Sequence, residues 1–156
     1  MTISLFCSSF WVVWSADFNK GLDAYLKGDY TTALKEFKPL AEGGDKDAQY
    51  LLWSLYADGA GVIQDYKMAF KWYILSAEQG HSGSHFELGV LYFFGKGVLE
   101  DIVYAHMWAN IASLSGDDEA INLKFDLQEK MTPSQIEKAV DLARECFKKN
   151  YKGCWT

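Results

Sequence analysis

Two stretches of this sequence, LWSLYADGAGVIQDYKMAFKW at residues 52–72 and LGVLYFFGKGVLEDIVYAHMW at residues 88–108, carry the same residue at nine matching positions. The offset between them is 36 residues, and a period of that length is typical of repeat proteins built from stacked units. The shared positions pair Leu52 with Leu88, Leu55 with Leu91, Tyr56 with Tyr92, Gly59 with Gly95, Gly61 with Gly97, Val62 with Val98, Asp65 with Asp101, Ala69 with Ala105, and Trp72 with Trp108.

Each copy has the pattern of two helices joined by a glycine turn. Leu52, Leu55 and Tyr56 share one face of a first helix, and the glycine pair that follows ends it. Asp65 and Asp101 stand where the N-cap of a second helix is expected. Because neither helix can bury its apolar face alone, the sequence predicts that the units stack.

The fold class we predict is all-α, a right-handed α/α solenoid of about two repeats over residues 44–116. An N-terminal capping hairpin is expected at residues 16–43, and C-terminal capping helices at residues 117–156. The run Thr132-Pro133-Ser134-Gln135 is a strong helix start, with Thr132 as N-cap and Pro133 at the first position.

The repeat resembles that of the Sel1-like repeat (SLR) family, a subgroup of the tetratricopeptide-like solenoids. The resemblance covers nearly all of the chain after residue 15, and the flanking segments resemble the caps of short bacterial exported members. It implies a binding or adaptor role in protein complexes. One departure is Trp53, where the second repeat has Gly89. The residues that carry the resemblance are Leu88-Gly89, Tyr92, Gly95, Gly97-Val98, Asp101, Ala105, Trp108 and Gly116, with their earlier counterparts.

Composition excludes several classes of protein. The chain has 156 residues, of which 49% are hydrophobic and 23% charged, as in an ordinary globular domain. Fifteen basic residues against 21 acidic ones give a net charge of −6, and Arg144 is the only arginine. We therefore expect no nucleic-acid partner, because affinity for nucleic acid depends on clustered positive charge.

Residues 1–15 carry no charged side chain, and their apolar run is too short for a transmembrane helix. They resemble a signal peptide, although no Lys or Arg precedes the apolar run. We expect a periplasmic or secreted bacterial protein with no stable membrane span in the mature chain. The alternative is a cytoplasmic protein, if the leader does not function.

The location decides the chemistry of the cysteines. Without residues 1–15 the chain keeps two cysteines, Cys146 and Cys154, and an even pair in an exported protein suggests a disulfide. In the cytosol, two free thiols are expected instead.

No catalytic constellation stands out in the sequence, so we predict no enzyme, no cofactor and no metal site. His81 and His85 have the spacing of helical metal ligands, but Gly80 and Gly83 interrupt a helix through them. We interpret His81 as a solvated turn residue, and His106 as a surface or interhelix packing residue. The alternative function, an envelope enzyme or binder acting on cell-wall material, needs a convergent acid, base or nucleophile.

The predicted binding surface lies on the first helices, which commonly line the concave side of such solenoids. Trp53 and Phe93 are the favoured anchors for a protein or peptide partner, because the repeat skeleton does not require them. Tyr50 and Phe86 are equally consistent with packing between adjacent first helices. The full predicted site comprises Gln49, Tyr50, Trp53, His85, Phe86 and Phe93.

Overall fold

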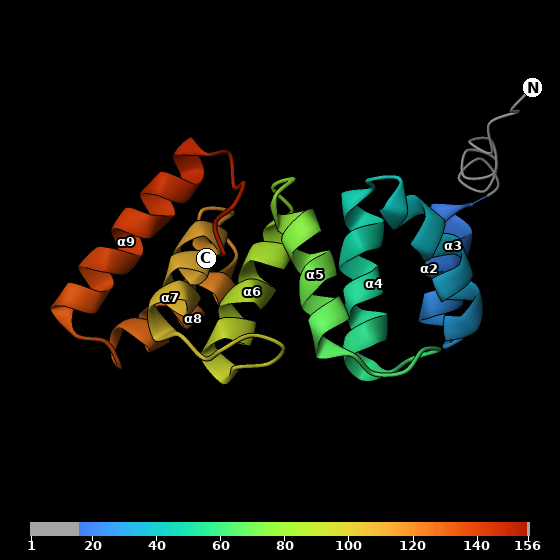
Figure 1. Ribbon diagram of the computed structural model, residues 1–156, viewed down its shortest axis with the longest axis horizontal. Coiled ribbons are helices and arrows are strands. Elements are labelled where there is room, and N and C mark those ends of the chain that lie inside the picture. Colours follow the sequence, from blue (N-terminus) through green and yellow to red (C-terminus); the bar gives the residue numbers. More distant parts are fainter. Residues whose placement is uncertain (1–15, 156) are drawn as a thin grey trace, which may run out of the picture.

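The computed structural model describes residues 16–155, and these form helices and turns with no strand. The helices follow one another in a row, with α2 at one end and α9 at the other (Figure 1). The predicted leader, residues 1–15, lies outside the described residues. No helix in the described range is both long and apolar enough to cross a membrane. The helices are α2 (Phe18–Leu26), α3 (Tyr30–Glu42), α4 (Lys46–Asp58), α5 (Tyr66–Ala77), α6 (Ser82–Phe94), α7 (Ile102–Ser113), α8 (Asp118–Gln128) and α9 (Pro133–Lys148).

Side-chain caps fix where the helices begin. The predicted N-caps Asp65 and Asp101 are confirmed, since each carboxylate accepts two backbone N–H groups from the first turn of its helix. Thr132 and Gln135 form the predicted capping box at the start of α9, with Pro133 at the first position. The all-helical solenoid inferred from the 36-residue period is therefore confirmed.

The turn between the two helices of a repeat presses against the preceding repeat unit. Gly97 has φ +76°, and a Cβ atom there would lie 2.5 Å from the carbonyl oxygen of Tyr66. Gly61 has φ +70°, and a Cβ atom added there would lie 2.9 Å from the carbonyl oxygen of Tyr30. Only glycine allows both this backbone conformation and this close approach. The paired contacts set the spacing between consecutive hairpins.

The interior consists of two hydrophobic clusters. One joins α2 to α5 around the fully buried Phe37 and Leu52, and the other joins α5 to α9 around Leu88 and Trp108. Trp53 packs against both clusters. The leucines and tryptophans that define the repeat are therefore core residues, as their helical spacing indicates.

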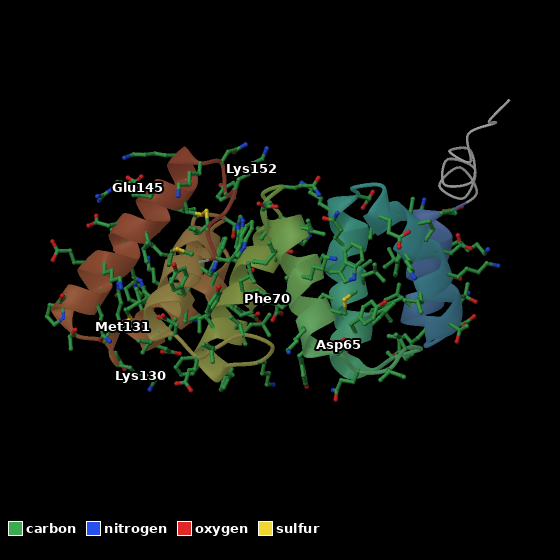
Figure 2. All side chains as sticks on the ribbon, viewed as in Figure 1. Asp65, Phe70, Lys130, Met131, Glu145 and Lys152 are labelled. Atoms are coloured by element: carbon green, nitrogen blue, oxygen red, sulfur yellow. A yellow bond between two sulfur atoms is a disulfide. The ribbon has the colours of Figure 1, made fainter. Side chains whose placement is uncertain are left out.

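The C-terminal residues fold back from α9 onto α6. Cys146 and Cys154 form a disulfide with a Cα–Cα distance of 5.5 Å. Asn150 (φ 53°) and Tyr151 (φ 67°) both take the left-handed conformation that reverses the chain. Gly153, with φ 66°, takes the same left-handed conformation two residues after Tyr151. Figure 2 labels Lys152 in this returning segment.

Two hydrogen bonds hold the returning tail in place. The Tyr92 hydroxyl donates to the carbonyl oxygen of Trp155 at 3.0 Å, and the Gly153 N–H donates to the Glu78 carboxylate at 3.3 Å. Glu78 is the C-cap of α5 and Tyr92 lies on α6, so the tail spans the junction between the two repeats.

Reduction of the Cys146–Cys154 disulfide should lower the free energy of unfolding by about 2–3 kcal/mol, because a short covalent loop restricts mainly the unfolded chain. Urea unfolding with and without dithiothreitol measures the difference. The Cys146→Ser, Cys154→Ser double variant is the control, since dithiothreitol should not change its curve. Equal stability of the oxidised and reduced wild-type protein would contradict the prediction.

Candidate functional site

Gln49 and His85, two of the predicted surface residues, are buried at the joints between repeat units. Gln49 Nε2 donates to the carbonyl oxygen of Ala41 at 3.0 Å, and His85 Nε2 lies 2.9 Å from that of Ala77. Each carbonyl lies at the end of the preceding second helix and already accepts a turn N–H, from Gly44 or Gly80, so the side chain adds a second bond to it. The two side chains are 4% and 3% exposed, so neither presents its polar atoms to a partner.

Trp53 is half-buried and packs inward against both hydrophobic clusters. Its ring stacks on Tyr73 of α5, with centroids 4.2 Å apart, and its indole nitrogen is buried. The equivalent positions of the second repeat hold Gly89 and Ala109, where a Cβ on Gly89 would lie 3.3 Å from the Ala109 nitrogen. At this contact between its two helices, the first repeat therefore has two large rings, whereas the second repeat has two small residues that let the helices approach closely.

Phe93 is half-buried and packs on Phe94, with ring centroids 4.9 Å apart. It occupies the same helix row as His85 and Gly89, and the matching row of α4 holds Gln49 and Trp53. Along this row, Gln49 and His85 bond to the preceding second helix, whereas Trp53 and Gly89 contact the second helix of their own repeat. The leucine pattern in the sequence does not reveal that this row is also packed.

Tyr50 and Phe86 are the two predicted residues that the structure brings together at the surface. Both line a pocket of about 220 Å³ between the first helices α4, α6 and α8. We call this hollow the first-helix pocket. Its remaining lining residues are Ser82, Gly83, Glu87, Ala112, Ser115, Asp117, Glu119 and Ala120.

Several contacts fix the Tyr50 ring at the edge of the pocket. It packs on His81 at 4.5 Å and on Tyr73 at 5.7 Å between ring centroids. Gly83 leaves the room that the ring needs, because a Cβ there would lie 3.3 Å from Tyr50 Cε2. Tyr50 is therefore held in one orientation before any partner arrives.

His81 supports Tyr50 from the turn that begins α6. Its Nδ1 accepts the Ser84 N–H as an N-cap, and its Nε2 lies 3.5 Å from the Asp47 carboxylate. We interpreted this residue as a solvated turn histidine, but it is half-buried and structural. Burial lowers the pKa of His81, an effect that Asp47 opposes.

The first-helix pocket is acidic. Glu87, Asp117 and Glu119 line it, and no Lys or Arg is among its described lining residues. Burial raises the pKa of the Glu87 carboxyl, and the charge of Glu119 raises it further. Glu87 in turn adds to the raised pKa of Tyr50, whose main cause is burial. Neither Glu87 nor Glu119 was predicted from the sequence, because an isolated acidic residue gives no signal until the fold brings it to a pocket.

A second hollow, of about 490 Å³, lies between α7 and α9. The large apolar side chains along it include Leu114 and Phe147, which are 68% and 52% exposed. Its only charged lining residues are Arg144 and Lys148, and each pairs with a carboxylate on α9 at 2.8 Å. It therefore offers mainly apolar area, with Asn110 as its uncharged polar lining residue.

The other candidate groups have structural surroundings. His106 is fully buried in α7 with no hydrogen-bond partner among the described residues, and burial lowers its pKa. Residues 16–155 contain no group of three or more His, Cys, Asp or Glu side chains that could hold a metal ion. The arrangement is suited to binding through shape, aromatic rings and negative charge.

These features define an α/α solenoid of stacked helix pairs with a small pocket between its first helices. The model of the Sel1 repeat matches residues 46–81 and 82–117, so the chain contains two consecutive Sel1 repeats. Sel1 repeats typically act as scaffolds for protein–protein interaction, and the fold is typically non-enzymatic. No curated protein matches the sequence.

The solved structures similar to this chain include the following two. A protective antigen present in uropathogenic Escherichia coli strains, displaying an SLR fold, is 26% identical over 96% of this chain, with a TM-score of 0.80. A Sel1 repeat protein from Oxalobacter formigenes is 28% identical over 69% of this chain, with a TM-score of 0.66. The chain spans 32% of the first protein and 44% of the second.

His85→Gln should reduce the sensitivity of the protein to acid. Burial lowers the pKa of His85, so the unfolded chain binds more protons below about pH 6.5 and stability falls as the pH drops. Gln49 makes the equivalent bond in the first repeat, so glutamine keeps the donor to Ala77 without a titrating ring. Thermal melts at about pH 7.5 and about pH 5.5 should show a smaller loss of Tm for the variant. An unchanged loss would contradict this role of His85.

Trp53→Ala should lower the free energy of unfolding by about 3 kcal/mol, because it leaves a cavity against Tyr73. Phe86→Ala is the matched comparison, and we expect a loss of about 1 kcal/mol from this half-buried ring. Urea unfolding measures both values. A negligible loss for Trp53→Ala would return this residue to the surface site expected from the sequence.

Proposed function

We propose that this chain is a non-catalytic scaffold that binds a segment of a partner protein on the side formed by α4, α6 and α8, in the bacterial cell envelope. The observation that carries the proposal is the first-helix pocket, in which three successive first helices contribute to one hollow. A polypeptide segment lying across these helices would contact both repeats and the C-terminal cap together.

The aromatic rings of the pocket support a binding role. Tyr50 is half-buried and fixed by Tyr73 and His81, so it loses little freedom when a partner binds. Rigid aromatic side chains in partly desolvated hollows are the usual anchors of protein interfaces. Phe86 lines the same pocket one repeat later.

The non-catalytic part of the proposal rests on the roles that the polar side chains already have. Gln49 and His85 satisfy backbone carbonyls, while His81, Asp65 and Asp101 cap helices. Glu87 and Glu119 have no histidine, cysteine or lysine beside them in the pocket lining. The pocket thus favours recognition over proton transfer or nucleophilic attack.

The envelope location is supported by two features. Disulfides persist in oxidising compartments, and Cys146 and Cys154 are paired. The uncharged, apolar residues 1–15 have the length of a signal-peptide core.

Photo-crosslinking from defined positions tests the binding side. A benzophenone amino acid replaces Phe86 in the first-helix pocket or, as the control, Phe147 in the hollow between α7 and α9. Irradiated cells of the native host should give a discrete protein adduct from position 86, and Tyr50→Ala should reduce its yield. Adducts from position 147 alone, or from neither position, would overturn the proposal.

A further inference from the structure

We propose that the first-helix pocket receives an arginine side chain of the partner, with its guanidinium group between Tyr50 and Phe86 and its charge facing Glu87 and Glu119. This inference rests on the proposed function, because it names the chemistry of the partner segment at that same site.

The size of the pocket indicates one side chain and not a whole small molecule. Its volume is about 220 Å³, whereas pockets for drug-sized ligands are usually about 300–1,000 Å³. The lining comes from α4, α6, α8, the end of α7 and the turn that follows it, and the hollow can be entered from the surface. A long, narrow side chain projecting from a bound segment fits such a hollow.

The charge of the pocket selects a cation. Three carboxylates line it, from Glu87, Asp117 and Glu119. Asp117 already accepts two N–H groups at the start of α8, and the helix ends at Ser82 and Asp118 contribute partial positive charge. That charge is about half a unit per helix, so it offsets only part of the negative charge. A positively charged guest would be favoured over a neutral or anionic one.

Glu87 is the carboxylate that a bound cation would stabilise most. Its side chain is half-buried, and no hydrogen bond or ion pair engages its carboxylate within residues 16–155. The buried Glu36, by contrast, pairs with Lys20 and accepts the Asp17 N–H. A partly desolvated carboxylate without a partner is unfavourable, and a charge-assisted hydrogen bond from a bound cation would relieve that cost.

The aromatic rings favour arginine over lysine. A planar guanidinium stacks on aromatic faces and donates two parallel hydrogen bonds to a carboxylate, whereas an ammonium group is a strongly hydrated point charge. Tyr50 and Phe86 provide the rings, and Glu87 lies on the same α6 helix as Phe86. The combination of two rings with adjacent carboxylates therefore matches a guanidinium.

An NMR titration with short peptides tests this inference on the whole protein. The probe is acetyl-Gly-Arg-Gly-amide, and the matched peptides replace arginine with lysine or with citrulline, its neutral isostere. We expect amide shifts at Gly83, Phe86 and Ala120 with the arginine peptide, and binding weaker by about tenfold with citrulline. Lysine should bind more weakly than arginine.

Glu87→Gln and Glu119→Gln should each weaken the arginine peptide by about fivefold or more. Glu42→Gln, an exposed change at the end of α3, is the control with the same change in net charge and should have no effect. A thermal melt of each variant checks that it is folded. The inference is overturned if citrulline or lysine binds as tightly as arginine, if the shifts lie elsewhere, or if both pocket variants behave like Glu42→Gln.

The two proposals can fail separately. If position 86 still gives its protein adduct in the Glu87→Gln, Glu119→Gln double variant, the binding side stands and the arginine assignment is wrong. If the arginine peptide binds as expected but position 86 gives no adduct, the pocket chemistry stands and the scaffold function is wrong.

Discussion

The close approach of one backbone to another at Gly61 and Gly97 is the constraint on which the rest of this structure depends. At Gly97, a single added carbon would collide with the Tyr66 carbonyl oxygen at 2.5 Å. The contact brings the turn of one hairpin onto the start of the preceding second helix. Because it recurs in both repeats, α4, α6 and α8 follow one another along the same side and can share one pocket.

Much of the fold follows from the repeat in the sequence. The 36-residue period identified the helix pairs, the glycine turns, the N-caps Asp65 and Asp101, and the buried Trp108, because each depends on local chemistry or on the helical period. The binding surface was predicted less well. Gln49, His85 and Trp53 lie away from the row of repeat leucines, but the packing of neighbouring helices buries the first two and half-buries the third. This burial is a tertiary effect that no spacing within one helix reveals.

The two repeats use different residues at equivalent packing positions. Gln49 and His85 each bond to the equivalent carbonyl of the preceding helix, and the Trp53–Tyr73 stack corresponds to the small pair Gly89 and Ala109. These differences preserve the spacing of the units, but they change the size of the side chain at each position and whether it can bind a proton. The acidic pocket depends on one such difference between the repeats. Glu87 lines the pocket, whereas Leu51, its counterpart in the first repeat, packs against the hydrophobic cluster there.

The returning segment has a consequence for the order in which parts of the fold are completed during synthesis. Trp155 bonds to Tyr92 across 63 residues, and Gly153 bonds to Glu78 across 75. While residues 151–155 are still inside the ribosome, the helices of both repeats can form, but the Tyr151 ring that packs on His85 is missing. The packing of the second repeat is therefore completed only when this segment emerges, whereas the cluster around Phe37 and Leu52, built from α2 to α5, has its partners much earlier.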